Sequence, residues 1–95
     1  MGIARIVRSQ AGHDKGDLFC VIGTDGELLL LADGKRRTVT SPKRKKRRHV
    51  AEMGTYGHPA IRRLLCGEPV SNSELRRALA AFRDQGGNKA WQKAT

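Results

Sequence analysis

The sequence predicts a mostly β domain, a small five-stranded barrel, followed by one or two α-helices packed on it. Residues 1–55 contain short β-rich runs that are separated by glycine-containing turns. Residues 56–86 carry helix-capping signals and an apolar stripe of helical period instead. A chain of 95 residues has room for one small domain. The remaining segment, 87–95, is polar and is expected to be a flexible tail.

Five short strands are expected, one for each β-rich run. They cover residues 4–9, 18–22, 27–32, 37–40 and 47–53. The pairs Asp25-Gly26 and Asp33-Gly34 predict tight hairpin turns, because glycine reaches positive φ without steric cost. Pro42 has no amide hydrogen to donate and should interrupt the sheet. Several short strands in so short a stretch are typical of a small barrel.

Two helices are expected after the strands. The first covers residues 59–66, with His58 as its cap and a proline at its first position. The second begins with a capping box formed by Ser71 and Glu74 and ends at Gly86. Its apolar residues recur on one helical face, at Leu75, Ala78, Leu79 and Phe82.

The second and third strands should be covered on both faces. A half-buried strand alternates apolar and polar residues, whereas residues 18–22 and 28–31 are apolar on both faces. One face can point into the barrel, and the other needs a cover. We therefore expect Leu75, Leu79 and Phe82 of the second helix to pack on the outside of these strands.

Basic residues outnumber acidic ones, 19 to 9, and the formal net charge is +10. Two clusters concentrate the excess. They are Lys35-Arg36-Arg37 and the uninterrupted run Lys43-Arg44-Lys45-Lys46-Arg47-Arg48, called here the basic run. Like charges repel by up to about 1 kcal/mol per pair at ~4 Å in water, so neither cluster is expected to form a core. A cation that neutralises a phosphate releases a condensed counterion, so such density favours a nucleic-acid partner. We expect the basic run to contact mainly the backbone and to be disordered until bound.

No pattern of residues indicates catalysis, a cofactor or a metal site. Cys20 and Cys66 lack zinc-ligand spacing and are expected to be small buried residues of a reducing compartment, although a disulfide between them stays open. The apolar runs are far shorter than the ~20 residues of a membrane span, and no signal peptide is evident. A cytoplasmic protein is therefore expected. Binding to a membrane surface is disfavoured because the basic run lacks interleaved bulky apolar residues.

The stretch from Val7 to Gly23, with Gly16 in the loop between two β-rich runs, resembles the KOW motif, a strand, a glycine-containing loop and a second strand. Its continuation through residues 30–37 and 42–46 resembles small KOW-domain RNA-binding proteins of clostridia-like Firmicutes. These are similar to the KOW-bearing large-subunit ribosomal proteins of archaea and eukaryotes. Residues 71–79 also resemble the helix that ends this branch.

The resemblance implies an SH3-like barrel whose loops contact RNA, often ribosomal RNA. By match to the motif, the RNA-facing loop contains Gly12, His13, Asp14, Lys15 and Gly16. Asp14 disfavours phosphate and is expected to orient the loop. The candidate RNA-binding residues are Gly12, His13, Lys15, Gly16, Lys35, Arg36, Arg37, Lys43, Arg44, Lys45, Lys46, Arg47 and Arg48.

The expected function is that of a non-enzymatic protein that docks on structured RNA, above all ribosomal RNA of the large subunit. It should be monomeric away from the RNA. Aromatic residues are scarce, which argues against a single-strand binder built on stacking platforms, and Tyr56 and Trp91 are the candidates for base stacking. The alternative is a transcription- or translation-associated interaction module of the NusG type that binds an acidic protein partner.

Overall fold

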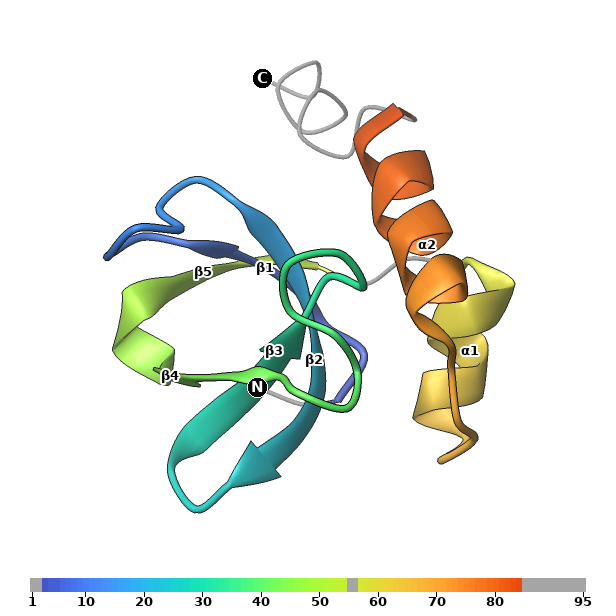
Figure 1. Ribbon diagram of the computed structural model, residues 1–95, viewed down its shortest axis with the longest axis horizontal. Helices are drawn as coiled ribbons and strands as arrows, with labels where there is room; N and C mark the ends of the chain where they lie inside the picture. Colours follow the sequence, from blue (N-terminus) through green and yellow to red (C-terminus); the bar gives the residue numbers. More distant parts are fainter. Residues whose placement is uncertain (1–2, 55–56, 85–95) are drawn as a thin grey trace.

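The computed structural model describes residues 3–54 and 57–84, which form one antiparallel sheet and two helices (Figure 1). The strands are β1 (Ile6–Ser9), β2 (Leu18–Asp25), β3 (Leu28–Ala32), β4 (Lys43–Lys46) and β5 (Val50–Gly54). They lie in the order β4-β3-β2-β1-β5. A short 3₁₀ segment, η1 (Arg47–His49), joins the two edge strands. The helices are α1 (Pro59–Leu65) and α2 (Asn72–Asp84).

The expected succession of five strands and two helices is confirmed. The sheet curls, and both helices lie together on its outer side (Figure 1). In the part of the chain that the structure describes, no ladder joins β4 to β5. The sheet therefore remains open between its two edge strands, and a closed barrel is not observed.

Two apolar clusters lie on opposite faces of the sheet. The inner cluster consists of Val7, Phe19, Val21, Leu29, Leu31 and Val50. The outer cluster joins residues of the sheet, which include Ile6, Leu18, Cys20 and Ala32, to Ile61 of α1 and to Leu75, Ala78, Leu79 and Phe82 of α2. The expected packing of α2 outside β2 is thus confirmed, whereas on β3 only Ala32 joins the outer cluster, and Leu28 and Leu30 are half-buried outside both clusters. Burying a side chain of the Leu or Phe type stabilises a fold by about 1.5–3 kcal/mol, so α2 is integral to this small domain.

The expected caps place both helices. The Nδ1 atom of His58 accepts a hydrogen bond from Ala60 N at 3.2 Å at the start of α1. Before α2, Ser71 Oγ accepts from Glu74 N at 3.1 Å, and Glu74 Oε1 accepts from Ser71 N at 3.2 Å. This reciprocal pair is a capping box, as the sequence predicts. The expected end of the second helix at Gly86 and the tail 87–95 lie outside the described residues.

Three sequence-based expectations are wrong. Residues 37–40 are not a strand: they lie in the loop that connects β3 to β4, and Val39 N donates a hydrogen bond to Asn72 Oδ1 at 2.8 Å. The basic run is not disordered, because it forms β4 and η1, and β5 consequently begins at Val50. Cys66 is exposed just after α1, whereas Cys20 is buried as expected, and both thiols are free.

Candidate nucleic-acid interface

The register of β4 divides the basic run between the two faces of the sheet. Lys43 pairs with Leu31 and Lys45 pairs with Leu29, whose side chains belong to the inner cluster. Arg44 and Lys46 lie between them and are exposed. Successive strand residues point to opposite faces, so Lys43 and Lys45 are directed inward and their neighbours outward.

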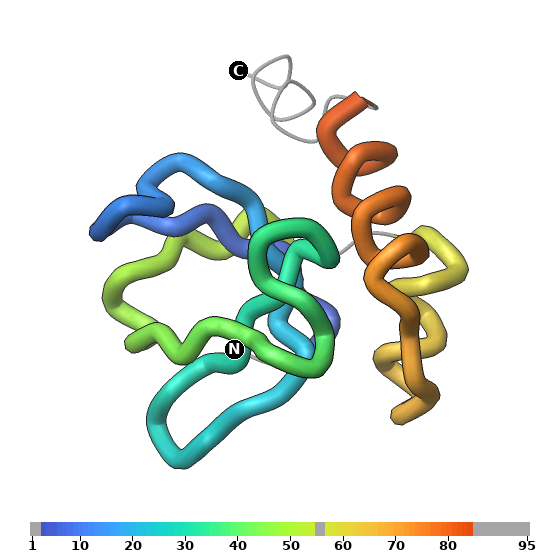
Figure 2. The backbone as a smooth tube through the Cα atoms, viewed as in Figure 1, coloured from blue at the N-terminus to red at the C-terminus, as the bar shows by residue number. Residues whose placement is uncertain are grey.

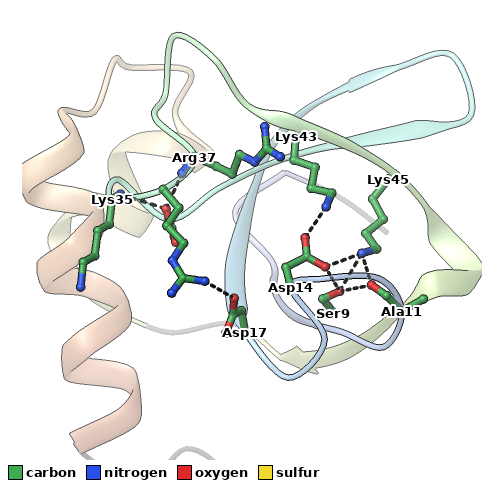
Figure 3. Close-up of polar contacts among 10 residues, drawn as sticks. Ser9, Ala11, Asp14, Asp17, Lys35, Arg37, Lys43 and Lys45 are labelled. Carbon is green, nitrogen blue, oxygen red and sulfur yellow. Dashed lines mark hydrogen bonds and ion pairs between the residues drawn. The ribbon is translucent and has the colours of Figure 1, made fainter.

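Asp14 lies between the two inward lysines (Figure 3). Lys45 Nζ donates to Asp14 Oδ1 at 2.7 Å, to Ser9 Oγ at 2.7 Å and to the Ala11 carbonyl at 2.6 Å. Lys43 Nζ is 2.6 Å from Asp14 Oδ2. These contacts connect β4 to the end of β1 and to the loop that follows it. We call the contacts among Ser9, Asp14, Lys43 and Lys45 the Asp14 network.

The Asp14 network controls the ionisation of its carboxylate. Burial alone would raise the pKa of Asp14, but hydrogen bonds from Lys43, Lys45 and Ser9 and the charge of Lys45 outweigh it. The pKa of Asp14 therefore lies well below its usual range. The expected role of Asp14 in orienting the loop agrees with these contacts.

Lys45 was expected to contact RNA, but its side chain is buried. Its side chain is 7% exposed, and Nζ has three oxygen partners within the protein. No acidic residue is near the basic run in sequence, yet in space Asp14 pairs with two of its six cations, Lys43 and Lys45. Lys45 is therefore placed to hold the fold rather than to meet a phosphate directly. The Lys43 side chain is 24% exposed, intermediate between the buried Lys45 and the exposed outward cations of β4.

The loop 10–17 between β1 and β2 has a defined backbone. Gly12 and Gly16 have φ values of 86° and 93°, in the left-handed region that favours glycine. Gly16 N donates to the Ser9 carbonyl at 2.8 Å, which closes the base of the loop. His13 and Lys15 are exposed near its tip.

The cluster Lys35-Arg36-Arg37 lies in a loop that Asp33 organises. Asp33 Oδ1 accepts hydrogen bonds from Lys35 N and Arg37 N, each at 2.9 Å. All three basic side chains are exposed. Figure 3 labels Lys35 and Arg37 at this turn. Arg36 also approaches Asp17 at 3.5 Å, with 75% of its side chain exposed, so this ion pair is weak.

The same loop is docked on the beginning of α2 (Figure 2). Gly34 has a φ of 79°, and a Cβ atom there would lie 2.2 Å from the Asn72 carbonyl oxygen. Arg76 Nη1 donates to the Gly34 carbonyl at 2.6 Å. Only glycine fits this approach, so α2 sets the position of the three basic residues.

A groove of about 590 Å³ lies between α2 and two loops, the loop 10–17 and the 33–37 loop. Five basic and two acidic residues line it, together with three apolar or small ones and Gly16. They are Arg8, Lys35, Arg36, Arg76, Arg83, Asp17, Asp33, Leu18, Leu79 and Ala80. Sequence reasoning missed Arg8, Arg76 and Arg83 as site residues. Only the seven-residue spacing of Arg76 and Arg83, which puts both on one helical face, was a usable signal.

The outward cations of β4 and η1 form a separate basic surface. Arg44 pairs with Asp25 at 2.8 Å, and both side chains are more than half exposed. Lys46, Arg47 and Arg48 are exposed, and with Glu27 and Leu28 they border a shallow hollow of about 440 Å³. This surface and the 33–37 loop together carry most of the candidate RNA-binding residues. Tyr56 and Trp91, the stacking candidates, lie outside the described residues.

No family model matches this chain, and no curated protein matches it significantly. Among residues 3–54 and 57–84, no group of three or more His, Cys, Asp or Glu side chains could hold a metal ion. None of the helices in that part of the chain is long and apolar enough to span a membrane. Burial raises the pKa of the Cys20 thiol to about 12, so this side chain acts as an inert core residue.

Proposed function

We propose that the chain is a non-enzymatic RNA-binding protein that docks on structured RNA, with ribosomal RNA of the large subunit as the foremost candidate. The observation that carries this proposal is the set of cations that stay exposed while Lys43 and Lys45 pair with Asp14. The set comprises Lys15, Lys35, Arg36, Arg37, Arg44, Lys46, Arg47 and Arg48.

The arrangement of these cations favours RNA phosphates as their partner. They lie on fixed backbone, because Asp33 and α2 hold the 33–37 loop and β3 holds β4. Fixed cations lose less conformational freedom on binding than a disordered tail would. Arginine adds bidentate contacts to phosphate oxygens. Such a surface reads the shape and backbone of a folded RNA rather than its sequence.

The resemblance to the KOW motif supports the same proposal. Its loop corresponds to residues 10–17, where the glycines adopt left-handed backbone and the tip exposes His13 and Lys15. A five-stranded curled sheet is compatible with an SH3-like fold. In this proposal the Asp14 network keeps the loop in position beside β4, and the protein acts in the cytoplasm on ribosomes.

Co-sedimentation with ribosomes of the host organism tests this function. At low salt we expect the protein in the large-subunit fractions at about one copy per particle, and retention after a high-salt wash. A variant with Lys35, Arg36 and Arg37 replaced by Gln should be lost in the wash. Arg62→Gln/Arg77→Gln is the control, because both arginines are exposed on the helices outside the groove lining. Absence from the ribosomal fractions at low salt would contradict the ribosomal assignment. Equal loss of both variants would contradict the assigned surface.

A further inference from the structure

The groove between the loops and α2 is lined mainly by charged side chains. Its cations come from β1, the 33–37 loop and α2, and Leu18, Leu79 and Ala80 lie among them. The i, i+3, i+4, i+7 pattern relates Arg76, Leu79, Ala80 and Arg83. One face of α2 therefore lines one side of the groove. Leu18 and Leu79 are only 6% and 2% exposed and belong to the outer cluster, so Ala80 is the apolar side chain of this lining that is partly open to the groove.

The acidic groups in the groove already have partners. Asp33 Oδ1 accepts two backbone hydrogen bonds, and Asp17 Oδ2 pairs with Arg36. Arg8 and Arg76 each donate to a loop carbonyl, of Gly16 at 3.3 Å and of Gly34 at 2.6 Å. Each of these guanidinium groups retains further N–H donors, because arginine has five. Within the described part of the chain, Lys35 and Arg83 have no ion-pair partner.

The volume of the groove fits a ligand of nucleotide size. Sites for small molecules commonly occupy about 300–1,000 Å³, and this groove measures about 590 Å³. The bases of an A-form duplex are stacked and paired inside the helix, so they cannot enter such a groove. The unstacked bases of RNA loops and bulges can be splayed out, and arginine planes can stack on them.

We propose that this groove receives one unpaired nucleotide, from a bulge or loop of the structured RNA. Its base lies against Ala80 between the side chains of Arg76 and Arg83, and its flanking phosphates meet Lys35 and Arg36. This inference rests on the proposed function and adds that α2 takes part in RNA recognition.

Two RNAs that differ by one nucleotide test the proposal. The first is a blunt duplex of about 16 base pairs, and the second is the same duplex with one central bulged nucleotide. Affinities are measured by fluorescence anisotropy at one salt concentration, with each of the four bases at the bulge. Stacking one base is worth about 1–3 kcal/mol, so the wild-type chain should prefer a bulged RNA by roughly tenfold.

Two arginines of α2 provide matched variants. Arg83→Gln removes a groove cation and should reduce the preference for the bulge to less than about twofold. Arg77→Gln removes an exposed cation from the same helix but outside the groove lining, and should leave the preference unchanged. Far-UV circular dichroism checks that both variants remain folded.

The outcomes separate this inference from the proposed function. Equal wild-type affinity for the duplex and for every bulged RNA overturns the inference and leaves RNA binding intact. Equal effects of Arg83→Gln and Arg77→Gln on the preference overturn the assignment to the groove. Absence of binding to any of these RNAs at low salt overturns the proposed function and the inference together.

Discussion

The two lysine- and arginine-rich segments look alike in sequence and differ in structure. In the 33–37 loop, all three cations are exposed, because Asp33 and α2 hold the backbone from the inside. In β4, alternate cations point to opposite faces, and Asp14 forms ion pairs with the two inward ones. The same residue types therefore serve as surface in one segment and as interior in the other.

This difference shows that the period of the backbone decides which side chains of a charged segment are buried and which are exposed. A strand with a buried face directs every second residue inward, whatever its chemistry. A buried cation is costly unless it is paired and hydrogen-bonded, and Lys45 meets both conditions. The charges on β4, an edge strand, also discourage pairing with other chains.

The largest effect is expected where the 33–37 loop meets α2. Gly34→Ala should lower the free energy of unfolding by at least about 3 kcal/mol, because the left-handed backbone alone costs 1–3 kcal/mol and the new Cβ atom would overlap the Asn72 carbonyl. Urea denaturation measures the loss. Gly26→Ala is the control: its φ is 61°, but no atom lies within 4 Å of the new Cβ, so it should cost about 1–2 kcal/mol. Equal costs would show that the loop is not docked as described.

Neighbouring lysines of β4 should respond differently to one substitution. Lys45→Gln leaves Asp14 buried with only Lys43 as a counter-charge and should cost about 3 kcal/mol. Lys46→Gln removes an exposed side chain and should change stability by less than about 0.5 kcal/mol. Urea denaturation of the two variants under one set of conditions decides the matter. Similar costs would refute the inward and outward division.

The Asp14 network should make stability fall in acid. The pKa of Asp14 is lower in the folded chain than the 3.8 of an ordinary Asp, so below about pH 4 the unfolded chain binds the proton first. The contribution of the ionised carboxylate is complete above that pH and is lost as pH falls toward the folded value. Thermal unfolding between pH 7 and pH 2.5 should show a smaller acid-induced decrease for Asp14→Asn than for the wild-type chain. A decrease of the same size would assign the acid sensitivity elsewhere.

A smaller effect is expected at the cap that begins α2. Ser71→Ala removes the acceptor for Glu74 N and should cost about 1 kcal/mol. Because Asn72 and Arg76 hold the 33–42 loop, amide hydrogen exchange should also become faster at Val39 N, which bonds to Asn72. An unchanged exchange rate at Val39 N would show that the cap of α2 does not stabilise the loop.

Local signals in the sequence were sufficient for much of the fold. Asp-Gly turns, the capping box and the stripe on α2 each depend on residues close together in the chain. The covering of β2 by α2 followed from one further step, since an apolar strand on both faces needs a partner on both. These expectations are confirmed by the two apolar clusters.

The position of β4 in the chain could not be predicted from such local signals. Thr38-Val39-Thr40 has higher strand propensity than Lys43–Lys46, but Asn72 holds Val39 in a loop and Asp14 forms ion pairs with the inward lysines. Both causes lie far along the chain. The groove was missed for the same reason, because Arg8, Lys35 and Arg83 come together only in the folded chain.

The salt dependence of RNA affinity for Lys45→Gln and Lys46→Gln tests the central claim most directly. The two variants lose the same charge at adjacent positions. The plot of log affinity against log salt should become shallower by about one for Lys46→Gln, because one phosphate contact is lost, and should keep its slope for Lys45→Gln. If Lys45→Gln does not fold, Lys45→Met replaces it, because it removes the same single charge, keeps a long apolar side chain in the buried site and leaves Asp14 paired with Lys43. An equal loss of slope for the inward and outward lysines would contradict the account.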